Sequence, residues 1–247
     1  QSGARQLSSA LPQDDADFMA LLDEGKPIAG YYGALASWFD YDLLDEVAAR
    51  RTDWNFLLIG QSLDDSLKQH SLLTRANVKW VGPRAYASLP DYLQSFDVAL
   101  IPFAINDITL ATSPLKLYEY LAGGKPVIAT PMPECEMFKE VFIARNATEF
   151  ARLLDIAAER GRDETFRRRL RELAQENSWT ARVRAVEHLL EKEPASPIAG
   201  QNDDAATSDG VAATIAERFS QFRTATNEEF FAALTRHFAG IPDDSCL

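Results

Sequence analysis

Short apolar runs alternate with amphipathic stretches between residues 26 and 130. The runs are PIAGYYG, NFLLIG, VKWVG, DVALIPF and KPVIAT, and the stretches between them include YDLLDEVAAR, LPDYLQSF and PLKLYEYLA. This alternation is typical of βαβ units. The segments FLLI, VALI and VIA contain no polar position, which favours strands buried on both faces. The pattern predicts an α/β fold, with a Rossmann-like parallel sheet and helices on both faces, over residues 26–193.

The flanking regions follow other patterns. Residues 1–25 are interpreted as an interdomain linker with one short helix before Gly25, and residues 147–192 have helical apolar spacing, with a last helix capped by Ser178. Residues 194–210 are rich in Pro, Gly, Ser, Asp and Ala, which predicts a flexible linker. Residues 211–247 regain helical spacing but hold too few apolar residues for a core of their own. We therefore expect C-terminal helices there, as an appendage.

Composition and charge narrow the class of protein. A hydrophobic content of 46% excludes a globally disordered chain. The 25 Lys and Arg residues against 37 Asp and Glu residues argue against a nucleic-acid partner. Two cysteines are too few for a Cys-rich metal site or a secreted disulfide framework. No apolar stretch approaches the ~20 residues that span a bilayer, so we expect a cytoplasmic protein.

Candidate binding residues follow the apolar runs, because ligands of doubly wound sheets bind outside the carboxyl ends of the strands. Gly33, Gly60 and Arg84 follow the first three runs, and a loop leads from the fourth to Ser113. Ser113 is predicted to cap a helix whose first residue is Pro114 and which a pair of glycines ends. The N-terminus of that helix would face the site and offer N–H groups to an anion.

Lys116 and Glu119 lie three residues apart on this helix and so share one face, whereas Leu117 and Leu121 form a buried stripe. A cation near the helix start suits phosphate groups, and a carboxylate one turn deeper suits the paired hydroxyls of a ribose. An ordinary solvated ion pair explains the same spacing. From the residues alone both interpretations stay open.

The segment SPLKLYEYLAGGKPVIATPMPE, together with GYYGALASWFDYDLL, NFLLIG and LPDYLQSFDVALIPF, resembles the C-terminal, donor-binding domain of GT-B glycosyltransferases of the family-4 type. The resemblance covers about residues 27–193. It implies a retaining glycosyltransferase for polysaccharide or glycoconjugate synthesis that takes a nucleotide sugar, such as a UDP- or GDP-sugar, as its donor. It implies no cofactor and no metal ion.

The resemblance also implies partners. An N-terminal acceptor-binding domain is expected outside this chain, which by itself would be inactive. Peripheral contact of the full-length protein with the cytoplasmic face of the membrane is expected in addition.

The same resemblance assigns roles to residues. Glu119 corresponds to the carboxylate that holds the ribose, Lys116 and the Ser113 turn to the diphosphate site, and Arg84 to the loop that frames the base. Lys116 and Arg84 are the expected catalytic residues, since they would stabilise the departing diphosphate. The other expected donor-binding residues are Gly33, Gly60, Asn106, Asp107, Ser113, Pro114 and Leu117.

One position departs from the family pattern. Ala111 stands where members with a Glu-x7-Glu motif have another carboxylate, so Asp107 or the backbone of residues 106–112 is expected to replace its contact with the donor sugar. Two alternative functions remain: a nucleotide-sugar epimerase of GT-B-like fold, and a non-catalytic Rossmann-like interaction module. If the protein transferred a sugar to an added acceptor, the first alternative would be excluded. If it bound a nucleotide, the second would be disfavoured.

Overall fold

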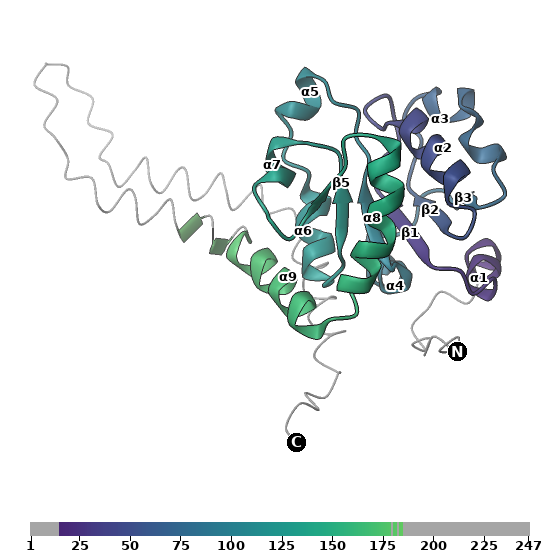
Figure 1. The fold of residues 1–247 in the computed structure, drawn as a ribbon. Helices are drawn as coiled ribbons and strands as arrows, with labels where there is room; N and C mark the ends of the chain where they lie inside the picture. Colours follow the sequence, from purple (N-terminus) through teal and green to yellow (C-terminus); the bar gives the residue numbers. More distant parts are fainter. Residues whose placement is uncertain (1–14, 179, 182, 185–247) are drawn as a thin grey trace, which may run out of the picture. The chain divides into compact units, whose positions relative to one another are not determined.

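A six-stranded sheet forms the centre of the fold. The computed structural model describes residues 15–178, 180, 181, 183 and 184 (Figure 1). The strand order is β3-β2-β1-β4-β5-β6 and every neighbouring pair is parallel, which confirms the predicted sheet. The strands are β1 (Ile28–Tyr32), β2 (Asn55–Ile59), β3 (Val78–Trp80), β4 (Val98–Ile101), β5 (Val127–Ala129) and β6 (Phe142–Ile143). The last was not predicted, because two residues are too few to produce a pattern.

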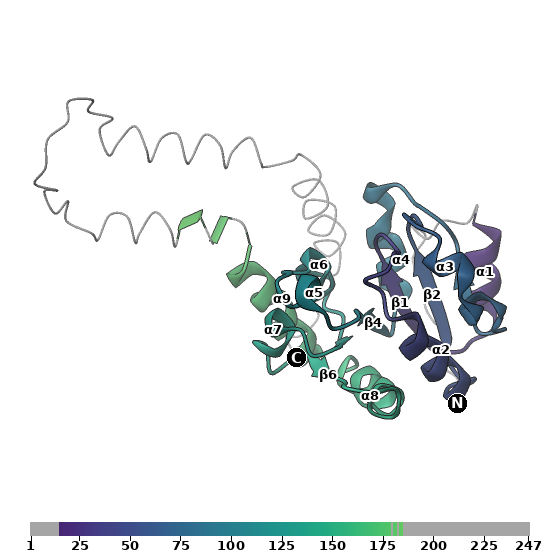
Figure 2. The same cartoon turned by 90° about the horizontal axis from the view of Figure 1, so that it is seen from above.

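Helices cover both faces of the sheet, as expected. In the view from above, α2 and α8 lie on one face and α4 and α6 on the other (Figure 2). The connections also contain two short 3-10 turns, η1 and η2. The bounds are α1 (Ala16–Asp23), α2 (Tyr41–Arg50), α3 (Ser66–Gln69), η1 (Ser71–Thr74), η2 (Tyr86–Ser88), α4 (Leu89–Ser95), α5 (Asp107–Leu110), α6 (Leu115–Ala122), α7 (Pro133–Glu136), α8 (Ala147–Arg160) and α9 (Glu164–Glu176).

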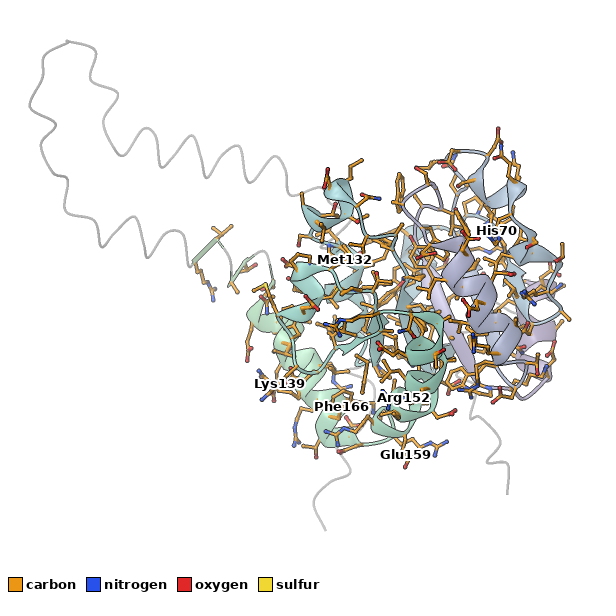
Figure 3. The ribbon with its side chains drawn as sticks, turned by 45° about the horizontal axis from the view of Figure 1, so that its top comes forward. His70, Met132, Lys139, Arg152, Glu159 and Phe166 are labelled. Carbon is orange, nitrogen blue, oxygen red and sulfur yellow. The ribbon has the colours of Figure 1, made fainter. Side chains whose placement is uncertain are left out.

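Local sequence signals place these helices. The Asp40 side chain caps α2 by accepting the Leu43 N–H at 2.9 Å, and Asn146 caps α8 in the same way at Glu149. Buried positions recur at helical spacing, as in α9, where Phe166 packs into the domain beside α8 (Figure 3). Side-chain caps thus set the starts of α2 and α8, and buried residues at helical spacing set the face through which a helix packs.

Helix α1 belongs to the sheet domain. Phe18 and Leu21 of this helix are buried, and the Phe18 ring lies 4.8 Å from that of Tyr92. The linker segment expected before residue 26 thus contributes to the core. At the other end, the Ser178 hydroxyl accepts the Ala181 N–H at 3.2 Å, which confirms the predicted cap. The expected linker (194–210) and helical appendage (211–247) lie outside the described residues.

The sheet reverses its strand order between β1 and β4. The chain moves from β1 to β2 and β3 on one side, and from β4 to β5 and β6 on the other. The register of β1 and β4 pairs Ala29 with Val98 and Gly30 with Ala99, so these two parallel strands end at the same edge of the sheet. Ligands of doubly wound sheets bind at such a switch point, outside the carboxyl ends of the strands. The loops after β1 and β4 are therefore where the candidate site is expected.

Candidate functional site

Helix α6 is fixed across the end of β1 by the side chain of Tyr120. Its hydroxyl accepts the Tyr32 N–H at 3.0 Å and lies 3.3 Å from the Tyr32 carbonyl oxygen, to which it donates. Tyr120 is fully buried, and its ring packs edge-on against the Tyr32 ring at 4.8 Å. The hydroxyl thus provides a hydrogen-bond partner for both the backbone N–H and the carbonyl of the last residue of β1. This contact aligns the first turn of α6 with the switch point.

The loops that follow β1 and β4 are tied to each other by backbone hydrogen bonds. The Asp40 N–H donates to the Pro102 carbonyl at 2.8 Å, and the Ala104 N–H donates to the Trp38 carbonyl at 2.8 Å. The Thr130 hydroxyl, at the end of β5, accepts the Phe103 N–H at 3.2 Å and donates to the Phe103 carbonyl at 2.7 Å. Phe103 is thereby held at the centre of this edge.

Lys116 extends from α6 over two aromatic rings at this edge. Its Nζ lies 5.4 Å from the centroid of Tyr31 and 5.2 Å from that of Phe103, within the range of a cation–π interaction. Among the described residues, no hydrogen bond or ion pair within 4.0 Å joins Nζ to a protein acceptor. Burial lowers the pKa of Lys116, and the charge of Glu119 opposes the shift. The site holds an ammonium group that lacks an anion in contact.

Glycine is required next to this lysine. A Cβ at Gly33, whose φ is +140°, would lie 2.6 Å from Lys116 Cε. Gly60 has a φ of +143°, and a Cβ there would lie 1.9 Å from the Gly33 carbonyl oxygen. Both positions thus combine a left-handed backbone with close packing, which only glycine accommodates. The lysine side chain occupies the space beside Gly33, and the expected approach of a donor to this glycine stays a prediction.

The start of α6 differs by one residue from the prediction. Pro114, expected at the first helical position, is itself the N-cap, and no side chain caps the helix, so the prediction that Ser113 is the cap is wrong. The physical reason is the backbone of Pro114, whose ψ of 107° is extended and not helical. Leu115 and Lys116 are then the first helical residues, whose N–H groups have no acceptor within the helix. The expected helix N-terminus is present and uncapped.

Glu119 lies one turn deeper and is buried, with 8% of its surface exposed. The Tyr86 hydroxyl donates a 2.7 Å hydrogen bond to its Oε1. Burial raises the pKa of Glu119, and the Tyr86 and Tyr32 hydroxyls and the Lys116 charge partly oppose the rise. The interpretation of Lys116 and Glu119 as a solvated surface ion pair is therefore wrong.

Three expected donor-binding residues have other local roles. Leu117 is fully buried and its N–H donates to the Pro114 carbonyl at 2.9 Å, so these contacts give no support to the expected contact of Leu117 with a donor. The Asn106 side chain caps the short helix α5 by accepting two backbone N–H groups at 3.0 Å. Asp107 is the exposed first residue of α5, and Ala111 ends that helix. The stretch expected to be a loop thus contains one helical turn.

Arg84 is committed to a different contact from the one expected. Its guanidinium binds the Asp15 carboxylate, with Nε 2.9 Å from Oδ2, and donates to the Tyr92 hydroxyl at 2.9 Å. It also donates to the carbonyl oxygens of Val81 and Pro83. Four of its five N–H donors are thereby used. The expected catalytic role of Arg84 gains no support from these contacts, which attach the loop after β3 to the N-terminus of α1.

Sequence reasoning missed the aromatic residues of the site. Tyr31 and Phe103 hold Lys116, Tyr120 holds α6, and Tyr86 holds Glu119. The pair Tyr31-Tyr32 at the end of an otherwise aliphatic run was an available signal, because an aromatic hydroxyl at a strand end usually finds a polar partner.

Other polar clusters of the domain are structural. His70 lies on the β2–β3 side of the domain, where its Nε2 is 2.9 Å from an Asp42 oxygen and its Nδ1 accepts the Leu72 N–H (Figure 3). Across the described part of the chain, no group of three or more His, Cys, Asp or Glu side chains could hold a metal ion. Nor does any helix there have the length and apolarity to cross a membrane.

Comparison with known proteins gives a consistent group of relatives. A family model described as "Glycosyl transferases group 1" matches residues 27–160. TuaH of Bacillus subtilis (strain 168), a protein named as a teichuronic acid biosynthesis glycosyltransferase, is 26% identical over 165 residues, which cover 64% of this chain and 42% of TuaH.

Solved structures share the fold. HepE of Anabaena, in a crystal structure with UDP and glucose, superposes with a TM-score of 0.55 at 20% identity, over 73% of this chain and 53% of HepE. TarM superposes with a TM-score of 0.52 at 14% identity, over 68% of this chain and 35% of TarM. The chain therefore spans about half, or less, of the length of these proteins.

The raised pKa of Glu119 predicts how stability depends on pH. Between the ordinary glutamate pKa of about 4.3 and the raised value, the folded state binds more protons than the unfolded state, so the free energy of unfolding falls as pH rises through this window. Glu119→Gln should abolish that fall, so the variant gains stability over the wild type as pH rises. Urea unfolding at several pH values measures the difference, with exposed Glu46→Gln as the control. A difference that does not vary with pH would contradict the assignment.

The contacts of Arg84 predict a role in stability. Arg84→Gln and Asp15→Asn should each lower the free energy of unfolding by about 1–3 kcal/mol, because each leaves a partly buried polar partner unsatisfied. The double variant should lose little more than either single one, since both remove the same contact. Chemical denaturation of the three variants tests this. If Arg84→Gln is as stable as the wild type, the Arg84–Asp15 contact does not stabilise the fold, and the predicted stabilising role of Arg84 is wrong.

Proposed function

Because the chain belongs to the glycosyl transferases group 1 family, we propose that its sheet domain binds the nucleoside diphosphate part of a nucleotide sugar, as the donor half of a glycosyltransferase. The observation that carries the proposal is the Lys116 ammonium, held over two rings at the switch point without an anionic contact. The products of such an enzyme would be polysaccharides or glycoconjugates, in keeping with the name of TuaH.

The diphosphate would occupy the space beside Lys116 and the start of α6. Burial lowers the pKa of this lysine and the Glu119 charge opposes the shift only in part, so the charged form is incompletely compensated within the protein. A diphosphate supplies that compensation, and the free N–H groups of Leu115 and Lys116 add donors aligned with the helix dipole. The rings of Tyr31 and Phe103 lie beside the ammonium group without neutralising it. The three features together favour a phosphate ligand over a neutral one.

Glu119 would bind the ribose. The residue lies one helical turn from Lys116, so a ligand with phosphate at the helix start places its sugar ring near the carboxylate. A carboxylate has about four acceptor positions, of which the tyrosine hydroxyls use only part. The remaining positions suit the two neighbouring hydroxyls of a ribose. Hydrogen bonds to a charged, partly desolvated acceptor are among the stronger ones.

The chemistry would rest on charge stabilisation. As the bond between the sugar and the diphosphate breaks, its electron pair passes to the phosphate oxygen, where Lys116 and the N-terminus of α6 stabilise the new charge. The acceptor hydroxyl forms the new bond to the sugar, and its proton passes to the departing diphosphate. The described residues supply the leaving-group half of this scheme. The acceptor, its binding domain and any contact with a membrane surface belong to the proposal for the whole protein, about half of which the chain spans.

Neither alternative function has an observation in its favour. An epimerase would share the nucleotide site, and only transfer to an added acceptor separates the two. A non-catalytic interaction module would have no use for a half-buried lysine that lacks an anion in contact and lies beside a helix N-terminus. Nucleotide binding is thus the first property to measure.

Calorimetric titration with UDP and with uridine tests the proposal. UDP is the first probe because one HepE structure contains UDP and another contains UDP-glucose. Glu119→Gln should weaken both ligands by about 1.5–3 kcal/mol, since both carry the ribose. Lys116→Met should weaken UDP by a similar amount and leave uridine unchanged, because the lost partner is phosphate charge. GDP and guanosine form a parallel pair if the base differs.

Lys139→Met is the matched control, since Lys139 is an exposed lysine that lies beside α9 (Figure 3). It should bind both ligands as the wild type does. If Lys116→Met and Glu119→Gln also bind nucleoside diphosphates with wild-type affinity, the proposed site is wrong. If no nucleoside diphosphate binds the folded wild-type chain, the interaction module becomes the better account.

A further inference from the structure

Tyr86 connects Glu119 to a part of the chain that lies outside α6. It begins the 3-10 turn η2, in the segment that joins β3 to α4, and its hydroxyl lies 2.7 Å from Glu119 Oε1. The two residues are 33 positions apart in sequence. Tyr86 is half-buried, and burial together with the nearby Glu119 charge raises its pKa well above the ordinary tyrosine value. The phenol therefore stays a neutral donor throughout the physiological range.

The segment that carries Tyr86 is tied to α1 on its N-terminal side. The Arg84 guanidinium donates to the carbonyl oxygens of Val81 and Pro83 and binds Asp15, the cap of α1. After Tyr86, Ser88 closes the turn by donating to the Ala85 carbonyl from its N–H at 3.0 Å and from its hydroxyl at 2.8 Å. Tyr86 is therefore carried by a closed turn next to this ion pair. The ion pair of Arg84 thus contributes to the site by fixing this segment.

A carboxylate at the end of a glutamate side chain can rotate, and rotation changes which hydroxyls it can accept. The bond from Tyr86 takes one acceptor position of Oε1 and restricts the rotation of the group. From this geometry we propose that Tyr86 is a positioning residue, which holds the Glu119 carboxylate in the orientation that accepts the two neighbouring hydroxyls of a ribose. The inference rests on the proposed function, since it assumes that Glu119 binds the sugar of a nucleotide.

The proposal makes Tyr86 a determinant of specificity for ribonucleotides. Removal of its hydroxyl should impair only those ligands that carry the ring hydroxyls. It should also change how binding depends on pH. The titratable groups that face Glu119 among the described residues are Tyr86 of η2, Tyr32 of β1, and Lys116 and Tyr120 of α6. Without Tyr86 one stabilising donor is lost, so the carboxylate is protonated at a higher pH.

The experiment is calorimetric titration of Tyr86→Phe with UDP and with its dideoxy analogue, which lacks both ring hydroxyls, between about pH 5 and pH 9. Tyr86→Phe should weaken UDP about tenfold at neutral pH and leave the analogue unchanged. The fall of UDP affinity on acidification should begin at a higher pH than in the wild type. In a Glu119→Ala background, Tyr86→Phe should have no further effect, because the group it orients is absent.

Tyr118→Phe is the matched control. The Tyr118 hydroxyl also donates to a carboxylate, that of Glu134, from the residue next to Glu119 on the same helix. This variant should bind UDP as the wild type does. Thermal unfolding of both variants confirms that each is folded, and Tyr86→Phe retains the ring and its packing. A second substitution, Tyr86→Trp, removes the phenol and keeps an aromatic ring, and it should show the same selective loss.

Each outcome separates this inference from the proposed function. If Tyr86→Phe weakens UDP and its dideoxy analogue equally, or leaves the acid limb of the UDP profile in place, Tyr86 is only structural and the inference is wrong. If Tyr86→Phe binds UDP as the wild type does while Glu119→Gln does not, the inference again fails and the proposed ribose site stands. If Glu119→Gln also binds UDP normally, the proposed function itself fails.

Discussion

The candidate site depends on the placement of one ammonium group at the point where the sheet reverses its strand order. Lys116 is held over the rings of Tyr31, which lies in β1, and Phe103, which lies just after β4. These two strands flank this point. Aromatic faces attract a cation without neutralising it, so the charge remains available to a ligand. Gly33 supplies the space for the lysine, and Tyr120 anchors the helix that carries it. Substitution at any of these positions would move the charge away from the edge of the sheet.

Much of the fold could be predicted from the sequence, because its signals are local. The segments FLLI, VALI and VIA are buried strands, and α2 covers the predicted stretch YDLLDEVAAR, from Asp40 as its cap. The glycines after the candidate helix end it, with Gly124 at a φ of +63°. Within the site, the spacing of Lys116 and Glu119 indicated a shared face, and the buried positions of Leu117 and Leu121 agree with that geometry.

The rest of the site could not be predicted, because it depends on contacts between segments far apart in the chain. No local pattern indicates that Tyr86 would reach Glu119, or that Arg84 would bind Asp15 across 69 positions. The cap of α6 was misplaced by one residue because Pro114 fits both the last extended and the first helical position, and only its ψ distinguishes them. The burial of Glu119 likewise comes from packing around α6, which spacing cannot show. Long-range pairing decides such features, and sequence periodicity does not record it.

The central claim is that the unpaired charge at the switch point is a diphosphate site, and a crystal structure of this chain with bound UDP tests it most directly. The account predicts that phosphate oxygens lie within hydrogen-bond distance of Lys116 Nζ and of the first N–H groups of α6. It also predicts that both ribose hydroxyls contact the Glu119 carboxylate while Tyr86 keeps its bond to Oε1. A nucleotide bound elsewhere on the domain, or one whose phosphates point away from α6 with Lys116 still covering only the two rings, would contradict it.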